Sequence, residues 1–135
     1  MPSTFLRLTV LSPLILAGML ACPPPGLAAT LTVTDLGDSG TPGQLRTLIN
    51  QAAPGDTIVI PVGTITLTGA AGENANIGGD LDINKNLTIQ GAGPGVTIID
   101  GGGIDRVFDI FAATVTITIS GVTIRNGNAG AGRFG

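Results

Sequence analysis

The sequence contains no histidine, tryptophan or tyrosine, and its 135 residues include a single cysteine. A Ser-His-Asp triad, an imidazole base and a histidine-ligated zinc site all require histidine, so the composition excludes each of them. Stacking of sugar rings on tryptophan or tyrosine is excluded for the same reason. A lone cysteine forms no disulfide within the chain, so the fold must be stabilised by packing alone.

Charged residues are also scarce, at 11% of the chain, and the formal net charge is -3. Such a chain has too few basic groups to neutralise a row of phosphates, so we expect no nucleic-acid partner. Hydrophobic residues make up 43% of the sequence, which is enough to form a buried core. By length, that core belongs to one domain.

Residues 1–28 have the features of a signal peptide. Arg7 precedes a mostly apolar stretch from Leu8 to Ala21, which is shorter than a membrane span. A proline-rich break follows, and small residues precede Ala29. We therefore expect an exported protein, secreted or at the cell surface, whose mature chain begins near Ala29 and has no transmembrane span. The alternative is a lipoprotein anchored at Cys22, where the apolar stretch ends.

After residue 28, apolar and polar residues alternate in short runs that are separated by glycine clusters. In Thr64–Thr68 and Val115–Ile119, aliphatic residues occupy one face and threonines the other. This period of two is typical of half-buried β-strands. Residues 41–53 differ, because Leu45, Leu48 and Ile49 are spaced as on one face of a helix. We expect an amphipathic helix there, capped by Thr41 and ended by Pro54-Gly55.

Inward-facing residues recur at an interval of 21 or 22 positions, which suits one turn of a solenoid. The predicted columns are Ile65 with Leu87 and Phe108, Leu67 with Ile89 and Ile110, Ile77 with Ile98 and Ile119, and Ile83 with Ile104. In such a coil each strand pairs in parallel with its counterpart one turn on. The alternative is an antiparallel meander or sandwich with a hairpin at Asn126-Gly127, but no return strand follows. The sequence therefore predicts an all-β parallel solenoid with an N-terminal helix.

Four segments carry a resemblance to a known family. They are Gly43-Gln44-Leu45-Arg46, then Pro54-Gly55-Asp56-Thr57-Ile58, and the strands around Asn86-Leu87-Thr88 and Ile119-Ser120-Gly121. Between Ala29 and Asn128 the chain resembles a right-handed parallel β-helix of the pectate-lyase-like superfamily. More narrowly, it is similar to the N-terminal part of bacterial surface proteins with a CSLREA-type entry motif, although Gln44 replaces the usual serine.

The resemblance implies a division into a signal peptide (1–28), an entry strand with a capping helix (29–56) and incomplete β-helix coils (57–135). Family members usually continue for more coils, so we expect a chain that is truncated at its C-terminal side. The implied function is that of an exported surface or interaction protein without catalytic activity of its own. Polysaccharide or other cell-surface molecules are the expected partners. The alternative is a calcium-dependent polysaccharide lyase of the pectate type, or another carbohydrate-active β-helix enzyme.

Asp80, Asp82 and Asn84 are the candidate metal ligands, because they alternate with Leu81 and Ile83 and so leave a strand on one face. Their oxygens suit Ca²⁺, and we expect no other cofactor. We favour a solvated polar strand face for these residues, with the Ca²⁺ site as the alternative.

A lyase would also need a basic residue near carboxylates. The basic candidates are Arg106 and Arg125, and the carboxylates that they could meet are Asp100, Asp105 and Asp109. For Asp105 and Arg106, surface ion pairing is the alternative interpretation.

Overall fold

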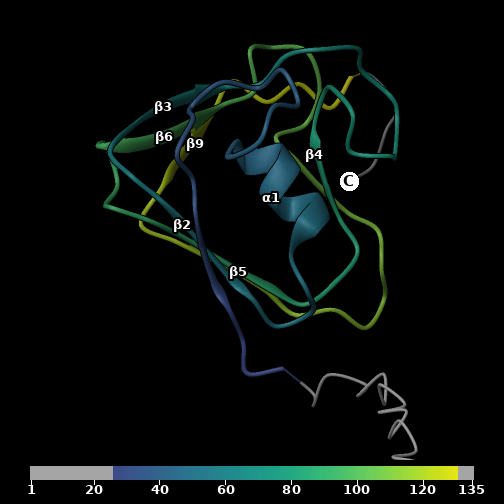
Figure 1. The fold of residues 1–135 in the computed structure, drawn as a ribbon. Helices are drawn as coiled ribbons and strands as arrows, with labels where there is room; N and C mark the ends of the chain where they lie inside the picture. The colour runs from purple at the N-terminus through teal and green to yellow at the C-terminus, as the bar shows by residue number, and fades with distance from the viewer. Residues whose placement is uncertain (1–25, 131–135) are drawn as a thin grey trace, which may run out of the picture.

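The computed structural model describes residues 26–130, which form a parallel β-solenoid of about three turns (Figure 1). Its elements are β1 (Thr30–Thr32), α1 (Leu45–Gln51), β2 (Thr57–Ile60), β3 (Gly63–Thr66), β4 (Leu81–Ile83), β5 (Leu87–Gly91), β6 (Thr97–Asp100), β7 (Phe108–Ile110), β8 (Ile117–Ser120) and β9 (Thr123–Arg125). The expected signal-peptide core, Cys22 and the last five residues lie outside the described part of the chain.

The strands stack into three sheets, in the orders β1-β2-β5-β8, β3-β6-β9 and β4-β7. Every pairing between them is parallel, and each strand bonds to its counterpart one turn on. The predicted solenoid is thereby confirmed, and the antiparallel meander is excluded.

The interval between stacked residues is longer and less regular than the sequence suggested. In the largest sheet, Leu31 pairs with Ile58, Ile58 with Ile89, and Ile89 with Ile119. The predicted interval of 21 or 22 residues is therefore wrong. Turns of unequal length separate the strands, so one fixed interval cannot bring every strand into register.

The predicted columns are wrong for the same reason. Ile65 pairs with Ile99 rather than Leu87, and Ile83 pairs with Ile110 rather than Ile104. Other predicted members are not inside at all. Ile77 lies in the turn before β4 with 79% of its surface exposed, and Ile110 is 48% exposed.

The aliphatic interior is nevertheless a single cluster that runs through the coil. Its fully buried strand residues are Ile58, Ile60, Ile65, Leu81, Ile83, Leu87, Ile89 and Ile99. Most of them alternate with outward residues along their strands, as the period of two predicts. Full burial of each such side chain contributes about 1.5–3 kcal/mol, so the interior is the main stabilising term.

Helix α1 crosses the interior of the coil at its N-terminal end (Figure 1). Leu45, Leu48 and Ile49 belong to the same buried cluster as the strands, which confirms the amphipathic helix. The helix is shorter than the predicted 41–53, and its N-cap residue is Gln44 rather than Thr41. Thr41 instead forms part of the preceding turn, where its carbonyl accepts a 2.9 Å hydrogen bond from the Thr47 hydroxyl.

Within residues 26–130, no helix has the length and apolar character that a membrane crossing requires.

Candidate functional site

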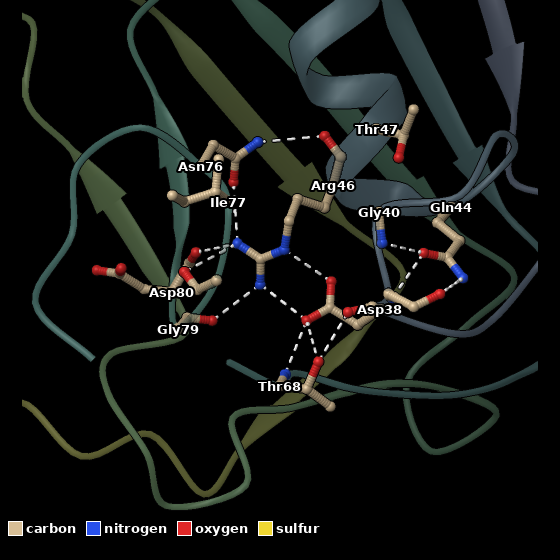
Figure 2. A network of polar contacts seen from close by, with 12 residues as sticks. Asp38, Gly40, Gln44, Arg46, Thr47, Thr68, Asn76, Ile77, Gly79 and Asp80 are labelled. Carbon is tan, nitrogen blue, oxygen red and sulfur yellow. Dashed lines mark hydrogen bonds and ion pairs between the residues drawn. The ribbon is translucent and has the colours of Figure 1, made fainter. Parts of the chain in front are cut away.

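Arg46 fastens helix α1 to the turns around it. Its guanidinium forms a bidentate ion pair with Asp38, with Nε–Oδ1 and Nη2–Oδ2 distances of 2.8 Å. It also donates hydrogen bonds to the carbonyl oxygens of Gly78, Gly79 and Asp80 at 3.1, 2.9 and 2.6 Å (Figure 2). Only 3% of the Arg46 side chain is exposed. Arg46, Asp38 and the 78–80 carbonyls thus form a clamp that closes the end of the coil through buried polar contacts.

Asn76 extends this clamp toward strand β4. Its side-chain oxygen accepts a hydrogen bond from Arg46 Nη1 and another from the backbone N–H of Asp82, both at 3.2 Å. Its amide nitrogen donates to the Arg46 carbonyl (Figure 2). The same nitrogen also donates to Asn50 Oδ1 at 2.9 Å. Asn76 has a positive φ of 53°, a conformation that asparagine tolerates better than most residues.

Gln44 organises the turn that leads into the helix. Its Oε1 atom accepts hydrogen bonds from the backbone N–H groups of Ser39, Gly40 and Thr41 at 2.8, 2.8 and 3.1 Å. Its Nε2 atom donates to Asp35 Oδ2 at 2.8 Å. The Gln44 side chain thus fills a buried polar site.

Lys85 binds the other end of the helix. Its Nζ atom donates to the carbonyl oxygens of Ile49 and Ala52 at 2.9 Å and to that of Asn50 at 3.3 Å. These carbonyls lie at the C-terminus of α1, where a cation is favoured by the helix dipole. The helix is therefore held at both ends by side chains.

Three carboxylates meet where β4 lies beside β7. Asp82 pairs in register with Asp109, and Asp80 directly precedes β4. One oxygen of each carboxylate lies within 4.8 Å of the others. Asp80 is fully buried and Asp82 is 6% exposed. The solvated-face interpretation is therefore wrong for these two residues, because Asn76 and Arg106 pack against their side chains.

Arg106 is the cation that pairs with this acidic cluster. Its Nη2 atom lies 2.9 Å from Asp80 Oδ2 and 2.8 Å from Asp109 Oδ2. Asp82 Oδ2 accepts a 2.9 Å hydrogen bond from the Asn76 backbone N–H. Among the described residues, nothing donates to the buried Oδ1 atoms of Asp80 and Asp82. The cluster therefore presents two buried carboxylate oxygens without a donor.

The electrostatics of the cluster follow from this arrangement. Burial raises the pKa of Asp80, against the opposing hydrogen bond from Arg106. Burial also raises the pKa of Asp82, and the neighbouring charge of Asp80 raises it further. Burial alone would lower the pKa of the Arg106 guanidinium, but its hydrogen bond to Asp80 and the nearby negative charges raise it. Arg106 is thus a strongly held cation and a poor proton acceptor.

Asn84, the third predicted ligand, does not join Asp80 and Asp82 in the buried cluster. It is exposed, and with Asp82, Lys85 and Phe111 it lines a depression of about 230 Å³. This depression connects solvent to the side of the cluster at Asp82.

The remaining charges named for a lyase separate into different places. Arg125 Nε lies 2.8 Å from Asp100 Oδ2, in the sheet that contains β6 and β9, away from the β4-β7 pair. The backbone N–H of Gly102 donates a hydrogen bond that lowers the pKa of Asp100, and smaller effects of the same sign come from the side chains of Asn126 and Arg125. Arg106 and Asp109 lie in or beside the acidic cluster.

Asp105 is 4% exposed, so its carboxylate is buried rather than at the surface. Its carboxylate accepts hydrogen bonds from the backbone N–H groups of Gly72 and Arg106, at 2.7 and 2.8 Å. These contacts tie the turn before β4 to the turn before β7.

The outer face of the largest sheet carries a ladder of hydroxyl groups. Thr30, Thr57, Thr88 and Thr118 are register partners on four successive strands. Adjacent members are about 4.8 Å apart across a parallel sheet. The alternating pattern predicted outward threonines, but their alignment into one ladder depends on a register that the sequence did not reveal.

No protein-family model matches the sequence, and neither a curated protein nor a solved structure matches it. Fold and site geometry are therefore the basis for assigning a function. By its strand pairing, the chain is a parallel β-solenoid with a helix across its N-terminal end.

Proposed function

We propose that this chain is the capped N-terminal section of an exported β-helix protein that works as an interaction module on the cell surface. The observation that carries the proposal is the ladder of Thr30, Thr57, Thr88 and Thr118. It is an uncharged, regularly spaced row of hydroxyls on the outer face of the largest sheet. Such a row suits an extended polyhydroxylated partner, namely a polysaccharide, because each hydroxyl both donates and accepts hydrogen bonds.

The motifs behind the family resemblance support the structural half of this proposal. Arg46 closes the helix onto the coil, and Gln44 holds the turn before it. Asp56, from the Gly-Asp-Thr-Ile step, accepts hydrogen bonds from the N–H groups of Ala29 and Ala53 at 2.8 Å. These two motifs thus help to close the N-terminal end, which is the role that the resemblance to CSLREA-type surface proteins implies for them.

The lyase alternative is less well supported by the geometry. Proton abstraction from a uronate needs a basic side chain that can give up its own proton. Arg106 is bound by Asp80 and Asp109, and its pKa is raised, so it is unsuited to act as that base. Arg125 is likewise paired, with Asp100.

Co-sedimentation with insoluble polysaccharides, both neutral and uronate-containing, tests the interaction. We expect the full chain to sediment with at least one of them. Thr88→Lys interrupts the ladder with a long charged side chain and should abolish binding. Thr64→Lys is the matched control, because Thr64 is an exposed strand threonine in a different sheet. Equal binding by the two variants, or no binding of the parent chain, would refute the proposal.

Two further measurements separate the remaining alternatives. Release of unsaturated uronate from pectin, followed by ultraviolet absorbance, would establish the lyase instead. Mass spectrometry of the mature N-terminus distinguishes a chain that begins at Ala29 from a lipoprotein acylated at Cys22.

A further inference from the structure

We propose that Asp80, Asp82 and Asp109 form a divalent-cation site that binds Ca²⁺ and links two successive turns of the solenoid. Asp80 and Asp82 lie at or in β4, and Asp109 lies in β7, which is stacked on β4 one turn further along the chain. The role is structural, and it is independent of the proposed polysaccharide interaction on the other sheet.

The first argument is the balance of charge and hydrogen bonds. The three carboxylates of the cluster pair with one guanidinium, which contacts the Oδ2 atoms of Asp80 and Asp109. Asp82 Oδ2 is bonded to the Asn76 N–H. These contacts leave the buried Oδ1 atoms of Asp80 and Asp82 without a donor. Because a buried, unsatisfied carboxylate oxygen is costly, a bound cation would complete the site.

The second argument is the spacing of the oxygens. Ca²⁺ binds oxygen at about 2.3–2.6 Å, so two of its ligands are at most about 5 Å apart. The mutual distance of up to 4.8 Å in this cluster falls within that limit. Mg²⁺ demands a near-ideal octahedral geometry and usually keeps several of its waters, whereas Ca²⁺ accepts irregular sets of carboxylate oxygens. We therefore expect the cluster, with ligands from two different turns, to bind Ca²⁺ in preference to Mg²⁺.

The third argument is access. A depression of about 230 Å³ is lined by Asp82 and Asn84, so one member of the cluster lies at its wall. This is the side from which an ion would enter, and the depression has room for water molecules to complete the six to eight oxygens that Ca²⁺ prefers. The exposed amide of Asn84 lies in the same depression, where it can contact such a water.

Isothermal titration of the full chain with CaCl₂ and with MgCl₂ tests the site, together with thermal melts. We expect one Ca²⁺ per chain, weaker binding of Mg²⁺ and a melting temperature raised by several degrees. Asp82→Asn and Asp109→Asn should each weaken Ca²⁺ binding by about tenfold or more, because each removes one anionic ligand. Asp100→Asn is the matched control, since Asp100 lies in another sheet, and should bind Ca²⁺ as the parent does.

If Asp82→Asn does not fold, Asp109→Asn decides the matter, because Asp109 lies at the rim of the cluster with 22% of its side chain exposed. The proposal is refuted if the folded parent chain shows neither heat nor a melting shift at millimolar Ca²⁺. It is also refuted if folded Asp109→Asn binds as tightly as Asp100→Asn. A polysaccharide-binding result of either sign leaves this test unaffected.

Discussion

Replacement of Arg46 by methionine should be among the most destabilising single changes in the chain. Methionine keeps much of the side-chain volume but removes six hydrogen bonds, including both bonds to Asp38. The Asp38 carboxylate and the carbonyls of Gly78, Gly79 and Asp80 then lose their shared donor inside the protein. Removing one partner of a buried ion pair costs about 3–5 kcal/mol, so we expect a loss of about 4 kcal/mol in the free energy of unfolding.

Urea unfolding followed by circular dichroism measures this loss. With a slope of about 2 kcal/mol per molar urea, the midpoint should fall by about 2 M. Arg125→Met is the matched control, because Arg125 also pairs with an aspartate but half of its side chain is exposed. The control should shift the midpoint much less. If the two variants shift the midpoint equally, the buried clamp does not hold the helix as we describe.

Three smaller perturbations test other parts of the structure. Gly43→Ala should lower the free energy of unfolding by about 2 kcal/mol, because φ is +86° and a Cβ would collide with Thr34 Oγ1. Gly40→Ala has a similar φ of +81° but open space around it, so equilibrium unfolding should show a smaller loss. Lys85→Met should cost about 1 kcal/mol and reduce the helical circular-dichroism signal, since the last helical carbonyls lose their donor; an unchanged signal and midpoint would contradict the assigned capping role. Burial raises the pKa of Asp82 in the folded protein, so folding favours its protonated form. With a chelator present, the free energy of unfolding should therefore be highest below the ordinary carboxyl pKa and should fall as pH rises through the raised pKa. Asp82→Asn should therefore lose less stability than the parent over that rise, and parallel pH profiles would disprove this assignment.

The sequence was sufficient to predict the strands and the amphipathic helix. Both depend on local periodicity, which is visible in segments such as Thr64–Thr68 and in the spacing of Leu45, Leu48 and Ile49. The parallel pairing was also predicted, although from a repeat interval that was too short. The register was not predictable in the same way. It depends on turn lengths, and the turn between β3 and β4 is much longer than the one between β8 and β9.

The candidate metal site shows the same limit. Asp80 and Asp82 could be chosen from their alternation with buried residues, but that alternation predicted an exposed face. Asp109 joins them only because β7 stacks on β4 with Phe108 opposite Leu81, a pairing of 27 positions that the assumed interval missed. Likewise, nothing near Lys85 in the sequence indicates that it binds the end of a helix more than 30 positions earlier.

The helix also sets the order in which the N-terminal end can fold. Its anchors are the 76–80 turn and Lys85, both of which are made after the helix during synthesis. A seven-residue helix is too short to be stable alone in water. A nascent chain that stops before residue 76 lacks all of these anchors, so its N-terminal end should remain open. The helix is thus synthesised before the residues that hold it, and it docks only once residues 76–85 have been made.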